Sequence, residues 1–137
     1  MSDAKRVTPP RPRASALLLV LTVPLVLIAL ATTVEYARYA YRTVALSSAV
    51  HDAVRTAAIR PCDWSPGPLD VARLAVHEGL ARRGGATGLS LDARIDGQPG
   101  AQVLTVSAAL PYHPLFGLVP VPRAVESTYG MPVAGAI

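Results

Sequence analysis

Residues 14–33 read ASALLLVLTVPLVLIALATT, a stretch without a single charged side chain. As an α-helix, this stretch would be about 30 Å long, which matches the hydrocarbon core of a bilayer. Soluble core helices seldom run this far without a charge. The stretch therefore predicts membrane insertion or export, with a transmembrane helix at residues 14–33.

The net charge of +4 is concentrated before this apolar stretch. Residues 1–13 hold four of the 13 basic side chains and one of the nine acidic ones, so the rest of the chain is close to neutral. Basic residues stay on the cytoplasmic side of a first transmembrane helix. The sequence therefore predicts a basic, disordered cytoplasmic tail at residues 1–13 and an extracytoplasmic domain at residues 34–137. We expect no nucleic-acid partner, because such a partner requires basic residues on the folded domain.

A cleaved signal peptide is the alternative to an uncleaved anchor. Residues 29–31 read ALA, an A-x-A pattern, so cleavage after Ala31 would release a secreted domain that begins at Thr32. No helix breaker lies between Leu25 and Ala31, however, and the helical pattern continues through the cleavage position. We therefore favour the uncleaved anchor.

The residues after the apolar stretch are typical of a helix that leaves a membrane. Glu35 marks the end of the hydrocarbon, and the tyrosines that follow can place the ring in lipid and the hydroxyl in water: Tyr36, Tyr39 and Tyr41. The helix is predicted to continue to about residue 59, before the proline of Arg60-Pro61. Small apolar side chains then recur at helical spacing at Val50, Ala53, Val54, Ala57 and Ala58. We expect this narrow stripe to let another element approach closely, and to pack against other subunits.

The hydrophobic period then changes from that of a helix to that of a strand. Residues 69–83 predict a shorter helix with arginines in its last turn, and Gly84-Gly85 stops it. Residues 89–96 and 102–110 alternate apolar and polar side chains, which predicts two half-buried strands with Leu104, Val106 and Leu110 facing the helix. A third strand is predicted from about residue 123 to residue 129. The predicted fold class is α+β, with a long helix, a short helix and a small antiparallel sheet.

This outline resembles the TadE-like family of minor pseudopilins, from the Tad (Flp, tight-adherence) branch of type IV pili. The matching pieces are VPLVLIAL around Pro24, the acidic–aromatic–small–basic step at residues 35–38, ALSSAVHDAVRTAA, VLTVSAAL and the PLFGLVP loop. The resemblance implies a pilin-like extracytoplasmic domain and a structural or assembly role in a Tad/Flp-type pilus or related secretion apparatus. It implies as partners other pilin-like subunits, membrane components of the assembly apparatus and the lipid bilayer.

Two positions depart from the family's pattern. Members usually carry a glycine just before the apolar segment, where prepilin peptidase cuts, and a glutamate five residues later. Aligned through Pro24 and Glu35, these positions hold Arg13 and Leu18. We therefore expect the chain to stay uncut, with a mature N-terminus at Met1 or Ser2. The protein would remain in the membrane part of the apparatus beside processed subunits.

The ionisable residues show no pattern of catalysis or cofactor binding. His51, His77 and His113 are scattered, and His77 lacks the second histidine of a zinc-protease helix. The glycines of RRGGATG lack the spacing and the lysine of a P-loop, and no serine lies in a G-x-S-x-G setting. A metal site from His51, Asp52, Cys62 and Asp63 would require a chance meeting in the fold. We expect no enzyme activity, no catalytic, cofactor-binding or metal-ligating residues, no cofactor and no small-molecule substrate.

The segment PCDWSPGP holds the only cysteine and the only tryptophan of the chain. Cys62 is expected to be a partly buried thiol, and an intermolecular disulfide is the alternative for an exported protein. Trp64 is expected to anchor its loop or to serve as a contact point.

Two functions from different classes remain open. The first is the pseudopilin, which acts by helix packing with other pilin-like subunits. The second is a membrane-anchored or secreted binding module unrelated to pili. It would use the loop PYHPLFGLVP, which places Tyr112, Leu115, Phe116 and Leu118 together. The same loop is also compatible with a place in the core.

Overall fold

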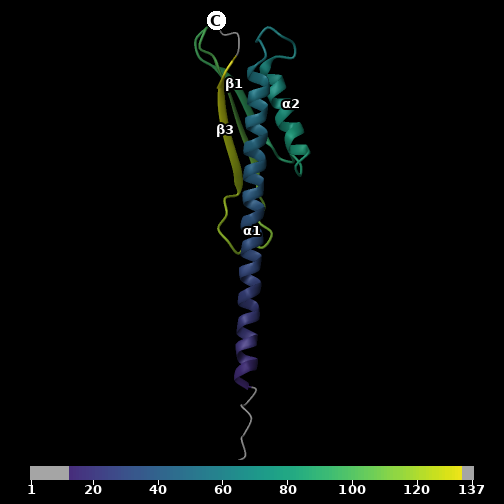
Figure 1. The fold of residues 1–137 in the computed structure, drawn as a ribbon, viewed down its shortest axis with the longest axis vertical. Coiled ribbons are helices and arrows are strands. Elements are labelled where there is room, and N and C mark those ends of the chain that lie inside the picture. Colours follow the sequence, from purple (N-terminus) through teal and green to yellow (C-terminus); the bar gives the residue numbers. More distant parts are fainter. Residues whose placement is uncertain (1–12, 134–137) are drawn as a thin grey trace, which may run out of the picture.

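One long helix forms the axis of the molecule (Figure 1). The computed structural model describes residues 13–133, and within them α1 (Arg13–Ala58) is continuous over 46 residues. At 1.5 Å per residue, the helix is about 70 Å long. The folded domain packs against only its second half, and the first half projects alone. The predicted long helix is therefore confirmed. Residues 1–12 of the predicted disordered tail lie outside the described residues, and Arg13 is the first residue of α1.

The projecting half of α1 is apolar and uncovered. Its large side chains are about half to three-quarters exposed, from Leu17 at 72% to Leu30 at 57%. By length and composition the helix is a candidate membrane span, and none of its most apolar stretch is buried by the rest of the chain. The hydroxyls of Thr32 and Thr33 donate hydrogen bonds to the carbonyl oxygens of Ile28 and Ala29, one turn earlier. These two side chains therefore present no unpaired donor to a surrounding apolar phase.

The second helix packs along the second half of α1. α2 (Pro68–Ala81) begins with a proline, whose fixed φ and missing N–H suit the first turn of a helix. It ends before Arg82 and Arg83, so the arginines that were predicted in its last turn lie just beyond it. A Cβ built on Gly79 would lie 3.2 Å from the Cβ of Ala49, so the two helices approach closely where both residues are small.

The sheet covers the other side of α1 and has three antiparallel strands. β1 (Ser90–Asp96), β2 (Val103–Pro111) and β3 (Ala124–Pro132) lie in the order β1-β2-β3, so each strand pairs with its neighbour in sequence. In the central strand, the alternate side chains are buried, at Leu104, Val106, Ala108 and Leu110. The predicted strand phase and the α+β fold are therefore confirmed. β3 continues to Pro132, beyond its predicted end.

The core lies between α1, α2 and the sheet. The predicted stripe of small residues on α1 belongs to this core: Val54 and Ala57 are 0% exposed, and Ala53 is 1% exposed. The small side chains let α2 and the sheet approach the helix, so the expected close approach occurs within the chain. The prediction that this stripe packs against other subunits is wrong, because the chain's own domain already covers it.

Candidate functional site

Glu35 is the only charged residue that is buried within residues 13–133. Its exposed fraction is 0%. Its carboxylate lies against the loop between β2 and β3. Oε1 accepts a hydrogen bond from the backbone N–H of Leu115 at 2.9 Å, and Oε2 accepts one from the N–H of Phe116 at 3.0 Å. From the sequence alone, Glu35 marks only the end of the hydrocarbon segment. In the structure, its side chain also fixes the loop to the helix.

Tyr112 completes this anchor from the first residues of the loop. Its hydroxyl lies 3.3 Å from Oε1 of Glu35 and 3.2 Å from the carbonyl oxygen of the same residue, and it donates to these acceptors. Its ring packs edge-on against Tyr39, with ring centroids 5.3 Å apart. Its backbone N–H donates to the carbonyl oxygen of Arg123 at 2.8 Å, which joins the two ends of the loop. The loop is thus closed on itself and tied to α1.

The hydrogen bonds at Glu35 also decide its charge. Burial alone would raise the pKa of the Glu35 carboxyl, but the N–H groups of Phe116 and Leu115 and the Tyr112 hydroxyl stabilise the carboxylate. With the positive charge of Arg38 nearby, the pKa of Glu35 falls below its ordinary value. Burial and the negative charge of Glu35 raise the pKa of the Tyr112 hydroxyl. At neutral pH the pair is therefore a carboxylate that accepts and a phenol that donates.

The loop between β2 and β3, residues 112–123, divides between the core and the surface. Tyr112 is 1% exposed, whereas Leu115, Phe116 and Leu118 are 56%, 52% and 56% exposed. Figure 1 shows this loop at the end of the domain from which the first half of α1 projects. Large apolar side chains therefore gather on the surface nearest to the apolar helix.

A cleft of about 450 Å³ lies along the same part of α1. Its charged lining residues are Arg38 and Arg42, one turn apart on α1, and Arg83, and no carboxylate lines it. The rest of the lining is Tyr41, two glycines and apolar side chains that include Val34 and Leu110. We call the loop of residues 112–123 and this arginine cleft together the base of the domain.

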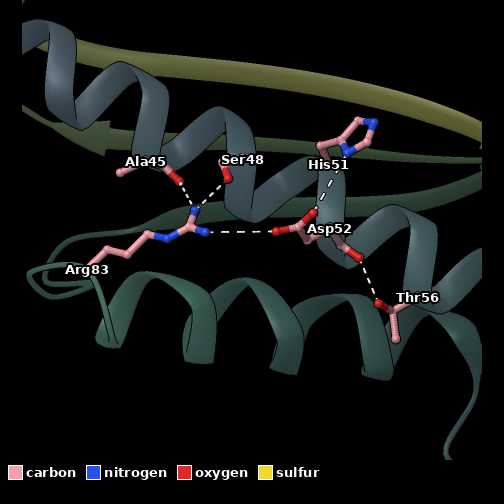
Figure 2. Close-up of polar contacts among 6 residues, drawn as sticks. All are labelled: Ala45, Ser48, His51, Asp52, Thr56 and Arg83. Atoms are coloured by element: carbon pink, nitrogen blue, oxygen red, sulfur yellow. Dashed lines mark hydrogen bonds and ion pairs between the residues drawn. The ribbon is translucent and has the colours of Figure 1, made fainter.

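Arg83 reaches from the end of α2 across to α1 (Figure 2). Its guanidinium donates to Oγ of Ser48 at 2.7 Å and lies 3.4 Å from the carbonyl oxygen of Ala45. The separation from the Asp52 carboxylate is 3.9 Å, and the Asp52 side chain is 68% exposed, so this ion pair adds little stability. The two shorter contacts hold Arg83 in the wall of the cleft.

Of the residues considered for a metal site, His51 and Asp52 lie 3.9 Å apart, from Nδ1 to Oδ1. His51 packs against the ring of Tyr129, with centroids 4.6 Å apart, while His77 and His113 are exposed elsewhere. Within residues 13–133, no group of three or more His, Cys, Asp or Glu residues could hold a metal ion. Cys62 is exposed, so the expected partial burial of its thiol is wrong. Trp64 is 59% exposed and does not anchor its loop by burial.

Comparisons of the chain with protein-family models, with curated proteins and with solved structures found no match. The functional proposal therefore stands on the residues and on the geometry of the described chain. The sequence did not identify Glu35 as an anchor, and it did not place Arg83 beside Arg38 and Arg42. The one signal for the anchor was an isolated acid immediately after a long apolar stretch.

Proposed function

We propose that this protein is a TadE-like minor pseudopilin, a single-pass membrane protein with a structural or assembly role in a Tad/Flp-type pilus or related secretion apparatus. The observation that carries the proposal is the continuous helix α1, whose apolar first half is uncovered and whose second half is built into the domain. A helix of this form can hold a small domain at a membrane and still offer a long lateral surface to other helices. The motifs around Pro24 and at residues 35–38 support the same assignment.

The surface for other subunits lies on the projecting half of α1. The stripe at residues 50–58 is occupied by the domain, so helix packing between subunits falls on the apolar segment before Glu35. Ala29 and Ala31 are small enough to allow a close approach between helices in a membrane. Leu18 stands where the family carries a glutamate, so this segment brings no charge of its own into the lipid. The protein packs beside processed subunits through apolar contacts.

The basic tail sets the orientation in this proposal. Residues 1–13 stay in the cytoplasm, α1 crosses the membrane, and the domain lies on the extracytoplasmic side. Arg13 replaces the glycine of the processing site, so the tail is retained. A retained basic tail is costly to bury in the apolar centre of a filament. The protein therefore acts at the membrane as a partner or initiator rather than along the filament.

Photo-crosslinking in the cell tests this function. A photoreactive residue is introduced at Leu21, on the projecting half of α1, and separately at Leu74 on α2 as the control. Both side chains are well exposed, at 73% and 61%. The proposal expects the probe at Leu21 to capture short pilin-like proteins or platform components of the apparatus, and the probe at Leu74 to capture much less of them. Adducts with lipid alone at Leu21 would contradict the pseudopilin function.

A binding module unrelated to pili is the second candidate. The exposure of Leu115, Phe116 and Leu118 favours it, because these side chains offer an apolar contact surface at more than half exposure each. In this function α1 is only an anchor, and its sequence is interchangeable. Exchange of residues 14–33 for an unrelated transmembrane helix separates the two candidates. A pseudopilin loses its role in assembly after the exchange, whereas an anchored binding module keeps its function.

A further inference from the structure

We propose that the base of the domain is a binding site for an anionic phospholipid in the leaflet from which α1 emerges. The inference rests on the membrane span of the proposed function. It goes further, because it assigns a ligand to the folded domain itself. The phosphate is taken by the arginine cleft, and the acyl chains contact the exposed apolar residues of the loop.

The depth of the loop is fixed by Glu35. The uncharged stretch of α1 ends at Val34, and the Glu35 carboxylate holds the N–H groups of Leu115 and Phe116 at 2.9 Å and 3.0 Å. The loop therefore lies at the level where the helix leaves the hydrocarbon. Leu115, Phe116 and Leu118 are more than half exposed at this level. Contact with acyl chains removes this apolar surface from water, which is favourable.

The arginine cleft begins at the same level and extends away from it. Val34 is at its lower end, and Arg38 and Arg42 follow about 6 Å and 12 Å further along the helix axis. The polar headgroup layer begins where the hydrocarbon ends and is about 5–8 Å thick on each side. Arg38 therefore lies within the headgroup layer, and Arg42 lies just above it. The guanidinium of Arg83 is bonded to Ser48, about 21 Å beyond Val34, so it lies well above the headgroup layer, and the phosphate is left to Arg38 and Arg42.

The charge of the cleft suits a phosphate. The lining has no carboxylate, and two of its guanidinium groups, those of Arg38 and Arg42, lie near the headgroup layer, whereas Arg83 is already bonded to Ser48 and lies 3.9 Å from Asp52. The ion pairs found within residues 13–133 involve His51, Arg83 and Arg94, but neither Arg38 nor Arg42. The charge of Arg38 also acts on the buried Glu35 carboxylate, which leaves Arg42 as the cation of the cleft that no carboxylate offsets in this way. A planar guanidinium can donate two parallel hydrogen bonds to phosphate oxygens, and it does so best where water is partly excluded. A lipid headgroup meets this requirement here, because the cleft continues into the apolar surface of α1.

Fluorescence quenching tests the depth of the loop. The full chain is reconstituted into vesicles whose acyl chains carry bromine, and Phe116→Trp is studied with Trp64→Phe, so that a single tryptophan reports. We expect a blue-shifted emission and strong quenching at position 116. The wild-type chain is the matched control, because its own Trp64 belongs to the loop between α1 and α2, which Figure 1 shows at the opposite end of the domain from the projecting half of α1. Little quenching at position 116, equal to that of Trp64, would overturn the contact with acyl chains.

Lipid titration tests the cleft. The full chain in a neutral detergent is titrated with phosphatidylglycerol, with phosphatidylcholine and with inorganic phosphate, and binding is followed by native mass spectrometry. We expect preferential binding of phosphatidylglycerol, weakened about tenfold or more by Arg38→Gln with Arg42→Gln, since each change removes a charge-assisted hydrogen bond. Arg55→Gln, exposed on the same helix but outside the cleft, should leave binding unchanged.

The possible outcomes distinguish the lipid site from the membrane span on which it depends. A chain that fails to float with vesicles has no membrane span, and both proposals fail. A chain that floats, but shows neither quenching at position 116 nor a preference for phosphatidylglycerol, keeps the span and overturns the lipid site. Displacement of the lipid by millimolar inorganic phosphate would assign the cleft to a soluble phosphate and would equally overturn the lipid site.

Discussion

The Oε1 atom of Glu35 on α1 accepts a hydrogen bond from the backbone N–H of Leu115, a residue 80 positions later in the chain. This contact, with its counterpart at Phe116, closes the end of the domain against the helix at the point where the apolar surface begins. The Glu35 carboxylate therefore holds the backbone of the loop against α1. It thereby also sets the position of the exposed apolar side chains of the loop.

Replacement of Glu35 tests this role. Glu35→Ala leaves two backbone N–H groups and the Tyr112 hydroxyl without their acceptor, so we expect a lower melting temperature in detergent and a loop that proteases cleave readily. Glu35→Gln should lie between Glu35→Ala and the wild type, because an amide has only one acceptor oxygen. Glu78→Gln, on the exposed face of α2, is the control and should melt like the wild type. Equal melting of all four proteins would refute the anchor.

The stability of the domain should fall in acid through Glu35. The folded state holds the pKa of this carboxyl below its ordinary value of 4.5, so the unfolded state takes up the proton at a higher pH than the folded state. The stabilisation is therefore fully present above about pH 4.5 and is lost as the pH falls through the folded pKa. Melting curves of the wild type and Glu35→Gln from pH 7 to pH 3 check this, and the variant should show the shallower decline. Parallel curves would contradict the assigned shift.

The strand phase predicts a large cost for truncation of the central strand. Leu104 is 0% exposed, so Leu104→Ala should lower the free energy of unfolding by about 2–5 kcal/mol. Leu74→Ala removes the same atoms from an exposed site and should change it by about 0.5 kcal/mol or less. Denaturant titration of the domain in detergent measures both. Similar midpoints for the two variants would show that Leu104 does not face α1.

Bulk in the small-residue stripe should damage folding. Ala57 is 0% exposed between α1 and its neighbours, so Ala57→Leu should cost about 1–3 kcal/mol through overpacking. Val44→Leu, on the exposed face of the same helix, is the control for added volume. The free energy of unfolding and the yield of folded protein are measured. A stable Ala57→Leu variant that fails only in crosslinking to partners would restore the intermolecular role of the stripe.

Local periodicity explains what could be read from the sequence and what could not. The 3.6-residue and two-residue periods predicted α1, α2 and the buried side of β2, because these patterns depend on neighbours in sequence. The period of the stripe showed that a face was covered, but it carried no information about whether α2 or another subunit covered it. The partners of Glu35 are backbone N–H groups of a loop without a regular pattern. Arg83 contacts α1 only because the loop after α1 brings α2 back alongside it. Such contacts leave no local signal.

In the proposed function, α1 is a retained membrane anchor of an uncut pseudopilin. This role is tested most directly by the intact mass of the protein isolated from carbonate-washed membranes, together with protease protection of intact cells. We expect a membrane-bound chain that begins at Met1 or Ser2 and whose residues beyond 34 are cut by protease added outside. A soluble product that begins at Thr32 would establish a signal peptide, and a chain cut near residue 13 would establish processing as an ordinary pilin. Either result would contradict the proposed function.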